Sequence, residues 1–350
     1  MMERRICKSV RVGNLTIGGG APVRVQSMLS RPAHDIPGNT AQAKELEQAG
    51  CEIIRAAVPD KESAALIAAL KESCTVPIVA DIHFDYRLAL ESLAAGADKI
   101  RINPGNIGAQ DRVKAVANAC KARNVPIRIG VNSGSLEKDI LAKYGAPVPE
   151  AMAASALRHA RLLEACDFYD IVLSLKSSNV ERTVRAYELL ARQCEYPLHV
   201  GVTEAGTQRM GVIKSSVGIG ALLLQGIGDT IRVSLTAEPV EEVRAGFDIL
   251  QAVGLGRGRP NIISCPACGR TKIDLVALAR AVEHRLAGCA KEITVAIMGC
   301  AVNGPGEARE ADIGLAGGDG CALLFARGEI LRKVPEGEAL DALMREIERL

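Results

Sequence analysis

Ile100-Arg101-Ile102-Asn103 is a short stretch in which β-branched and polar residues alternate. Successive side chains of a β-strand point to opposite faces, so the two isoleucines share one face and Arg101 and Asn103 share the other. We expect the isoleucines to face surrounding helices. Arg101 and Asn103 then face the interior of a closed sheet.

The same kind of run recurs along the chain, with amphipathic helical stretches between the runs, such as Ser63–Cys74 and Pro149–Ala165. Eight strands that are each followed by a helix predict an α/β fold, the (β/α)8 TIM-type barrel. A doubly wound open sheet is the alternative, but the strand-to-helix turns hold no G-x-G-x-x-G sequence. A hairpin around Gly13-Asn14 precedes the first unit and could plug one end of the barrel. The eight runs are 23–28, 51–58, 77–83, 98–104, 126–132, 170–176, 197–203 and 229–235.

Composition excludes several classes of function. The formal net charge is +2 and aromatic residues make up 3% of the 350 residues, which argues against nucleic-acid binding and against a membrane-surface protein. We find neither a signal peptide nor an apolar run of about 18 residues that could span a bilayer. Eleven cysteines in such a chain indicate a reducing compartment, so we expect a cytoplasmic protein with metal-bound or buried thiols.

Alternation along the other strands places more polar side chains in the interior. Five cations lie near the carboxyl ends of different strands, where the active sites of such barrels lie. The inward acids, Asp81 and Glu204, are too few to neutralise them, and arginine matches phosphate oxygens well. We therefore expect a pocket for a polyanion, most simply a diphosphate. The five cations are Arg55, Arg101, Arg128, Lys176 and Arg232.

Further candidates share this interior. Any single arginine has an alternative explanation, namely a carboxylate partner across the barrel, and His83 and His199, each taken alone, are better explained as structural than as catalytic residues. Ser133–Asp139 interrupts the pattern after the fifth strand and indicates an active-site loop. The other candidate substrate-binding residues are Asn103, Asn132, Ser234, Asp81 and His83.

A Gly- and Arg-rich stretch, Gly254–Pro260, predicts a linker between two domains. We place the barrel at residues 1–256 and a small α+β domain at residues 257–350. The second domain holds Cys265-Pro266-Ala267-Cys268 and, later, Met298-Gly299-Cys300, which is followed by the Gly-rich turn up to Glu307.

Three kinds of site fit these cysteines. One is a thioredoxin-like dithiol at Cys265 and Cys268, which leaves Cys300 and the following turn unexplained. Another is structural zinc, with Cys289, Cys321 or His284 as fourth ligand. The third is an iron–sulfur cluster held by three thiolates and one carboxylate, Glu307. The third explains the glycines as well, because they let backbone amides approach the sulfides.

The two cysteine segments, together with six motifs in the barrel, resemble the 4-hydroxy-3-methylbut-2-en-1-yl diphosphate synthase family of the methylerythritol phosphate route to isoprenoids. The resemblance covers nearly the whole chain and is to the short bacterial form. The barrel motifs are Val25-Gln26-Ser27-Met28, Ala80–Asp85, Arg101–Asn106, Arg128–Ser135, Val202-Thr203-Glu204-Ala205-Gly206 and Ile231–Leu235.

The resemblance implies a function and a cofactor. The reaction is the reductive ring opening and dehydroxylation of 2-C-methyl-D-erythritol 2,4-cyclodiphosphate, with flavodoxin or ferredoxin as electron donor. A 4Fe–4S cluster is bound by Cys265, Cys268, Cys300 and Glu307, and Glu204 acts as acid or base. A homodimer is implied, in which each cluster domain serves the partner's barrel. The alternatives are a barrel transferase of the pterin-binding sort and a non-catalytic iron–sulfur electron carrier.

Overall fold

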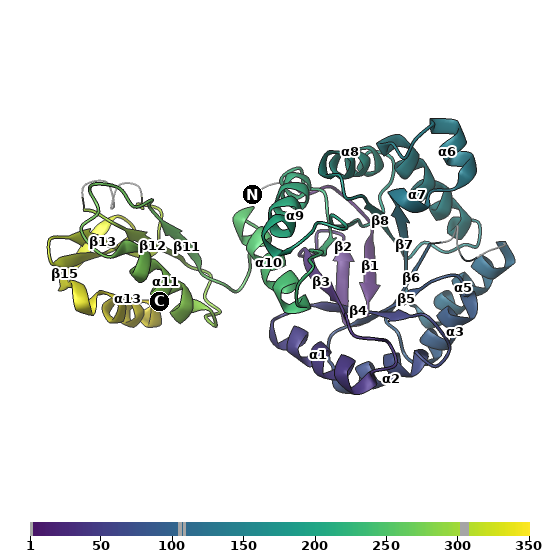
Figure 1. Ribbon diagram of the computed structural model, residues 1–350, viewed down its shortest axis with the longest axis horizontal. Helices are drawn as coiled ribbons and strands as arrows, with labels where there is room; N and C mark the ends of the chain where they lie inside the picture. Colours follow the sequence, from purple (N-terminus) through teal and green to yellow (C-terminus); the bar gives the residue numbers. More distant parts are fainter. Residues whose placement is uncertain (1–2, 104–106, 108–109, 302–307) are drawn as a thin grey trace. The chain divides into compact units, whose positions relative to one another are not determined.

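The computed structural model describes the chain except for residues 1–2, 104–106, 108–109 and 302–307. It divides into two compact units, Met1–Leu255 and Gly256–Leu350 (Figure 1). Within the described parts of the chain, no helix has both the length and the apolar character needed to cross a membrane.

The first unit is a (β/α)8 barrel, as predicted. Its eight parallel strands pair in the order β8-β7-β6-β5-β4-β3-β10-β9, and an isolated parallel bridge between Leu173 and Leu198 joins β8 to the segment before β9. The last two strands are much shorter than the predicted runs. The strands are β3 (Arg24–Met28), β4 (Ile53–Val58), β5 (Ile78–Ile82), β6 (Lys99–Ile102), β7 (Ile127–Asn132), β8 (Ile171–Lys176), β9 (His199–Val200) and β10 (Thr230–Ile231).

Helices surround this ring of strands (Figure 1). Ile100 and Ile102 of β6 and Ile127 and Ile129 of β7 are fully buried in the core between strands and helices, as the alternation predicted. The sequence prediction missed α6, which begins in the last two residues of the predicted active-site loop and extends beyond it to Tyr144. The helices are α1 (Ile36–Gln48), α2 (Ala64–Ser73), α3 (Tyr86–Ala94), α5 (Gln110–Arg123), α6 (Lys138–Tyr144), α7 (Pro149–Glu164), α8 (Val180–Ala191), α9 (Gln208–Leu224) and α10 (Pro239–Ala252).

The N-terminal hairpin closes the amino-terminal end of the barrel, as the sequence suggested. Its strands β1 (Ser9–Val12) and β2 (Leu15–Gly18) pair antiparallel around Gly13, whose φ is 56°. Val10, Val12 and Ile17 pack in one cluster against side chains near the starts of β4, β5 and β8. This end of the barrel is therefore an apolar floor, which leaves the carboxyl ends of the strands for binding.

In the residues that the structure describes, the second unit is a five-stranded mixed sheet with two α-helices. β11 (Asn261–Ser264), β12 (Thr294–Met298) and β13 (Ile313–Gly318) are parallel, and β14 (Cys321–Ala326) and β15 (Glu329–Pro335) continue the sheet antiparallel. The sequence prediction missed β15, whose residues are almost all exposed and so lack an apolar face. The two helices, α11 (Leu275–Leu286) and α13 (Ala339–Arg349), contribute to the main apolar core of this unit.

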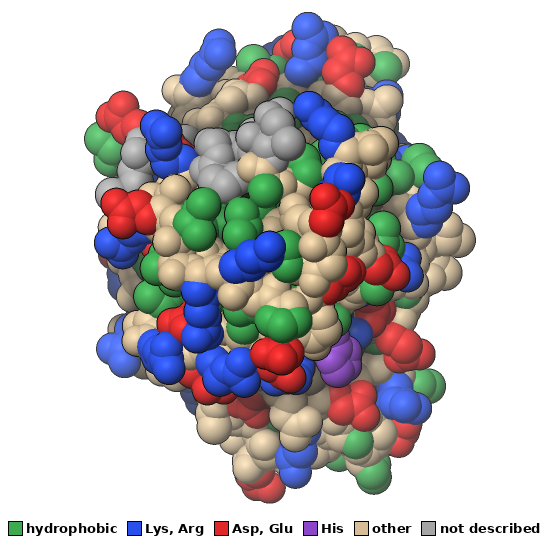
Figure 2. Space-filling model, turned by 90° about the vertical axis from the view of Figure 1, so that its left-hand side faces the viewer, with side chains coloured by type: hydrophobic (Ala, Val, Ile, Leu, Met, Phe, Trp, Pro, Cys, Tyr) green, Lys and Arg blue, Asp and Glu red, His purple; other side chains and the backbone are tan. Residues whose placement is uncertain are grey.

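Charge is evenly spread on the face of the molecule that Figure 2 shows. Basic and acidic side chains are interspersed there with hydrophobic ones. This distribution agrees with the formal net charge of +2 and contrasts with the barrel interior described next.

Candidate active site

The strand registers arrange the inward side chains of the barrel in levels. In barrels of this type, alternate strands contribute the side chains of one level. The Cα registers of neighbouring strands assign each inward residue to a level along the barrel axis. Four of these levels, counted from the hairpin end toward the carboxyl ends of the strands, concern the site. The basal level is Ile53, Lys99, Val172 and Thr230; the lower level is Gln26, Val79, Arg128 and His199; the middle level is Arg55, Arg101, Ser174 and Arg232; the upper level includes Met28, Asp81 and Gly130.

Asp81 is the carboxylate that holds two of the predicted arginines. Arg101 Nη1 donates to Asp81 Oδ1 at 3.0 Å, and Arg55 Nε lies 3.7 Å from Oδ2. Burial by itself raises the pKa of Asp81, but Arg55, His83 and Arg101 outweigh it and hold this pKa well below its usual range. Asp81 is therefore ionised, and it fixes both arginines at the middle level.

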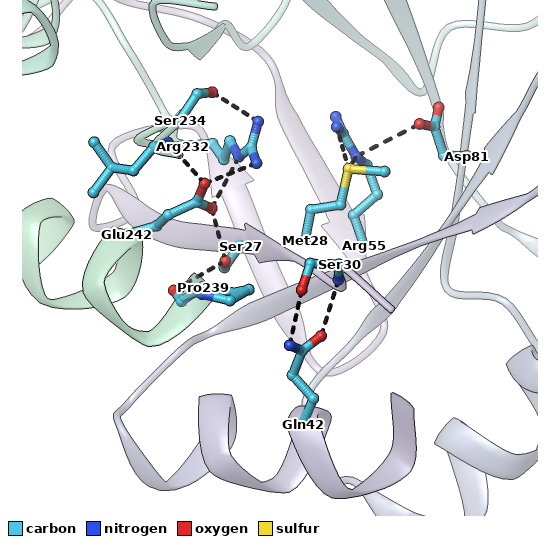
Figure 3. Close-up of polar contacts among 11 residues, drawn as sticks. Ser27, Met28, Ser30, Gln42, Arg55, Asp81, Arg232, Ser234, Pro239 and Glu242 are labelled. Carbon is cyan, nitrogen blue, oxygen red and sulfur yellow. Dashed lines mark hydrogen bonds and ion pairs between the residues drawn. The ribbon is translucent and has the colours of Figure 1, made fainter. Parts of the chain in front are cut away.

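Arg232 is held by an acid that the sequence analysis missed (Figure 3). Its Nη2 donates to Glu242 Oε1 at 3.0 Å and its Nε to Oε2 at 3.2 Å. Glu242 is buried, and it also accepts from Ser27 Oγ and from the Leu235 amide. The prediction that Asp81 and Glu204 are the acids of the interior was wrong in this respect, because Glu242 reaches the strands from helix α10. Strand alternation carries no signal for a helix residue of this kind.

Arg128 and Lys176 are buried without a carboxylate partner in the described chain. Arg128 is fully buried, and none of its three side-chain nitrogens has a hydrogen-bond partner. Burial lowers the pKa of Lys176 well below its ordinary value, and Arg55, Arg232 and Arg128 lower it further. Both side chains are thus available to a ligand.

The interior also holds a cation that sequence reasoning missed, Lys99. It lies on the inward face of β6, two residues before Arg101, and is fully buried. The same alternation that identified Arg101 could have found it. From the basal level upward, the described barrel therefore has six inward cations against two carboxylates, Asp81 and Glu242. The six are Arg55, Lys99, Arg101, Arg128, Lys176 and Arg232.

The remaining predicted residues lie at or near the carboxyl ends of the strands. Asn103 is buried directly after β6, and Asn132 ends β7. Ser234 accepts from Arg232 Nη1 at 2.7 Å. His83 is exposed, with its Nε2 3.4 Å from Asp81 Oδ2. Glu204 is exposed after β9 in a left-handed backbone conformation, with φ of 51°.

His199, in contrast, is fully buried, and one of its ring nitrogens links two neighbouring strands. Its Nδ1 lies 2.8 Å from Thr230 Oγ1 on the neighbouring strand β10. Burial lowers the pKa of His199 well below its ordinary value, and Arg128, Lys176 and Lys99 lower it further. The ring is therefore neutral, and it is fully enclosed at the lower level of the barrel.

The loop after β7 is anchored to helix α7. His159 Nε2 lies 2.6 Å from Glu137 Oε1, and Ser155 Oγ donates to Glu137 Oε2 at 2.7 Å. Burial raises the pKa of Glu137, but these two partners lower it by more, to about 2. Glu137 thus ties the end of the predicted active-site loop to the barrel wall.

The predicted cluster ligands lie near one edge of the second unit. β11 and β12 are parallel neighbours with Ser264 opposite Ile297, so Cys265 and Cys300 follow the carboxyl ends of adjacent strands. The Gly299 amide donates to Cys265 Sγ at 3.1 Å. A backbone hydrogen bond from Arg270 lowers the pKa of the exposed Cys268 thiol. The fourth predicted ligand, Glu307, is outside the described residues.

This donor set fits an iron–sulfur centre in its chemistry. Cys265, Cys268 and Cys300 are free thiols, and amide donors to sulfur stabilise the thiolates that such centres require. The three thiols are not drawn together into a preformed cage. Among the residues that the structure describes, no group of three or more His, Cys, Asp or Glu side chains is close enough to hold a metal ion.

The barrel is similar in fold to dihydropteroate synthases. The structure of the Yersinia pestis enzyme has a TM-score of 0.50 and 18% identity, and covers 70% of this chain and 98% of that chain. The Stenotrophomonas maltophilia enzyme has a TM-score of 0.50 and 15% identity, with 70% of this chain and 98% of that chain covered. At these identities the similarity concerns the fold alone.

Similarity to known proteins extends over the full length of the chain. Proteins named 4-hydroxy-3-methylbut-2-en-1-yl diphosphate synthase (flavodoxin) match from three bacteria. The one from Caldanaerobacter subterraneus subsp. tengcongensis is 55% identical, over 99% of this chain and 98% of its own. The one from Clostridium perfringens is 53% identical over the whole of both chains. The one from Geobacter sulfurreducens is 55% identical, over 98% of this chain and 97% of its own.

Family models match both units. The GcpE TIM-barrel domain matches residues 7–247, and the GcpE protein C-terminal domain matches residues 261–349. With the barrel, its cationic interior and the cysteine edge in place, these matches show that the chain belongs to the 4-hydroxy-3-methylbut-2-en-1-yl diphosphate synthase (GcpE) family.

Proposed function

We propose that the chain catalyses the reductive ring opening and dehydroxylation of 2-C-methyl-D-erythritol 2,4-cyclodiphosphate to (E)-4-hydroxy-3-methylbut-2-en-1-yl diphosphate. The proposal rests on the relatives named above and on similar ones, which bear this enzyme name and are 53–55% identical to the chain over nearly its whole length. The transferase alternative has only a fold similarity behind it. The electron-carrier alternative leaves the buried cations of the barrel without a purpose.

The cationic interior of the barrel supports a diphosphate substrate. Six inward cations face two carboxylates there. A buried cation without a partner costs several kcal/mol, and the two phosphoryl groups of the substrate would offset that cost. Arg101 and Arg128 would bind phosphate oxygens and take up negative charge as the ring opens. Asp81 would keep Arg101 and Arg55 oriented toward the ligand.

Proton transfer requires a group near the mouth of the barrel, and we assign it to Glu204. The family motif Val202-Thr203-Glu204 suggests this role, and Glu204 follows strand β9 at the carboxyl end of the barrel. A carboxylic acid at that position would protonate the leaving hydroxyl, which departs as water. His83, beside Asp81, is a second candidate for contact with the substrate.

We further propose that Cys265, Cys268, Cys300 and Glu307 hold a 4Fe–4S cluster. When bound, such a cluster would pass on, one at a time, the two electrons that the donor provides, and an iron with a weaker oxygen ligand would supply Lewis acidity. Flavodoxin would be the electron donor, as the names of the relatives state for those proteins. A homodimer in the cytoplasm completes the proposal, and the free state of the thiols agrees with a reducing compartment.

The test is anaerobic purification followed by an iron and sulfide count, an absorption spectrum, and an assay with the cyclodiphosphate and reduced flavodoxin. We expect about four irons per chain, a broad band near about 400 nm, and formation of the linear diphosphate. A colourless protein that binds only zinc would contradict the cofactor. A protein with a full cluster but no turnover would contradict the reaction.

A further inference from the structure

Lys99 lies at the floor of the barrel with no polar partner. Its side chain is fully buried, and its Nζ has no hydrogen-bond partner within the described chain. Ile53 and Val172, which lie on the same basal level as Lys99, pack against the N-terminal hairpin. The surroundings of Lys99 on the hairpin side are therefore apolar. Apart from Thr230 on its own level, which bonds His199, polar contact within the described chain is available to the amine from the lower level above it.

Three side chains of that lower level also have buried polar atoms without partners. These atoms are all three side-chain nitrogens of Arg128, Nε2 of His199, and both amide atoms of Gln26. Each of the three residues is no more than 1% exposed. They come from different strands, β7, β9 and β3, and converge above Lys99. Buried polar groups are nearly always hydrogen-bonded in folded proteins, so these atoms require partners that the described chain does not supply.

Among the residues that the structure describes, no acid pairs with Lys99 or Arg128. Asp81 lies at the upper level, where it binds Arg101 and Arg55. Glu242 binds Arg232. The groups that face Lys99 are therefore Arg128 and Arg55, the neutral His199, Thr230 and Gln26. Burial lowers the pKa of Lys99 well below its ordinary value, and Arg128 and Arg55 lower it further.

We propose that Lys99, Arg128, His199 and Gln26 form an oxyanion subsite at the floor of the barrel, in which Lys99 is a further binding residue for the deeper phosphoryl group of the ligand. The inference rests on the proposed function, since a diphosphate is the ligand that enters the barrel. An oxyanion offers acceptors to Lys99, Arg128 and the Gln26 amide at once. It also supplies the negative charge that the cluster lacks.

Proton uptake follows from this arrangement. In the free barrel, burial and the surrounding cations lower the pKa of Lys99. An oxyanion beside it reverses the sign of the local field and raises this pKa, so ligand binding is accompanied by proton uptake at pH values between the two pKa values. Binding therefore weakens as pH rises, and more steeply with Lys99 present than without it.

The experiment is calorimetric titration of the full chain with inorganic pyrophosphate, at several pH values and in two buffers of different ionisation enthalpy. The variant is Lys99→Met, and the matched control is Lys61→Met, whose side chain is 80% exposed. We expect Lys99→Met to bind about tenfold more weakly, the size of one charge-assisted hydrogen bond, and to take up fewer protons on binding than the wild type does. Lys61→Met should behave as the wild type does.

Folding is checked by thermal unfolding without ligand. An unpartnered buried amine contributes nothing to stability, so Lys99→Met should melt at or above the wild-type temperature, as should the second variant Lys99→Gln. If neither variant folds, or if both bind pyrophosphate with wild-type affinity and proton uptake, the subsite is overturned. If the wild type itself fails to bind pyrophosphate, the proposed function is contradicted along with it.

Discussion

Arg101 Nη1 donates to Asp81 Oδ1 at 3.0 Å, and this contact joins two neighbouring strands across the inside of the barrel. Asp81 also lies near Arg55 and His83, so one carboxylate orients side chains from three strands or their ends. The rest of the cationic interior is arranged around this residue. Its loss should therefore affect both the fold and the binding of anions.

Asp81→Asn should lower the free energy of unfolding by about 3 kcal/mol at neutral pH, because it leaves buried arginines without their counter-charge. Urea unfolding of the variant and the wild type measures this difference. The folded-state pKa of Asp81 is lowered, so its stabilisation is present above the unfolded value of about 3.9 and is lost as pH falls below it. A variant as stable as the wild type at pH 7 would show that the pair contributes nothing.

Arg128→Met should separate binding from stability. Arg128 has no partner in the described chain, so replacing it removes a buried, uncompensated charge and should leave the melting temperature unchanged or raise it. Pyrophosphate affinity should fall by about a hundredfold, since an arginine fork makes two charge-assisted hydrogen bonds to phosphate. The control is Arg123→Met, on the exposed end of α5. Wild-type affinity in Arg128→Met would contradict the barrel site.

Cys300→Ser should abolish the iron–sulfur absorption and lower the iron count after anaerobic reconstitution, because it removes one proposed ligand. Cys289→Ser is the control, as Cys289 lies in the same unit just after α11 and is also partly buried. Equal iron in both variants would contradict the ligand assignment.

Glu307→Cys should keep a cluster and lose turnover, and full activity in that variant would contradict the need for an oxygen ligand.

The alternation of side chains in a strand predicted much of this site. Arg101 and Arg128 were placed inside the barrel because their isoleucine neighbours required the outer face, and both are buried there. The same alternation also predicts that Lys99, two residues before Arg101 on β6, faces the interior of the barrel. Glu242 could not be found in this way, because a helix residue that reaches between strands has no period that points to the interior. The pairing of Arg232 was missed for that reason.

In the second unit the parallel strands were predictable and the last strand was not. β11 and β12 are apolar runs that end just before Cys265 and Cys300, so the sequence itself carries the signal that both thiols follow strand ends. β15 is exposed along nearly its whole length and is held by backbone pairing with β14. A strand with no buried face has no apolar pattern, and only its pairing partner defines it.

Glu137→Gln should make the loop after β7 less stable near neutral pH. The pKa of Glu137 is lowered to about 2, so the stabilisation that it provides is present above pH about 4.5 and disappears as pH falls toward 2. Hydrogen exchange of the amides in residues 133–144 measures the loop directly. The wild type should lose protection on acidification from pH 5 to about 3, whereas the variant should be poorly protected throughout.

The control is Asp139→Asn, whose partner Arg158 is largely exposed. Protection unchanged in Glu137→Gln would show that the His159 contact does not anchor the loop.

Gly130→Ala tests how closely the arginines of the middle level are fitted to the backbone. A Cβ at Gly130 would lie 2.6 Å from Arg101 Nε and 2.8 Å from its Nη2, so the guanidinium must move. That movement breaks its bond to Asp81 and withdraws it from the ligand. We expect pyrophosphate affinity to fall about tenfold and the free energy of unfolding to fall by about 1–3 kcal/mol, the usual cost of overpacking.

Gly220→Ala is the control, because its Cβ would meet only Val253 Cγ1 at 3.8 Å and alanine favours a helix. Wild-type affinity in Gly130→Ala, with unchanged stability, would mean that Arg101 has room to bind from another position and that the bond to Asp81 does not set its orientation.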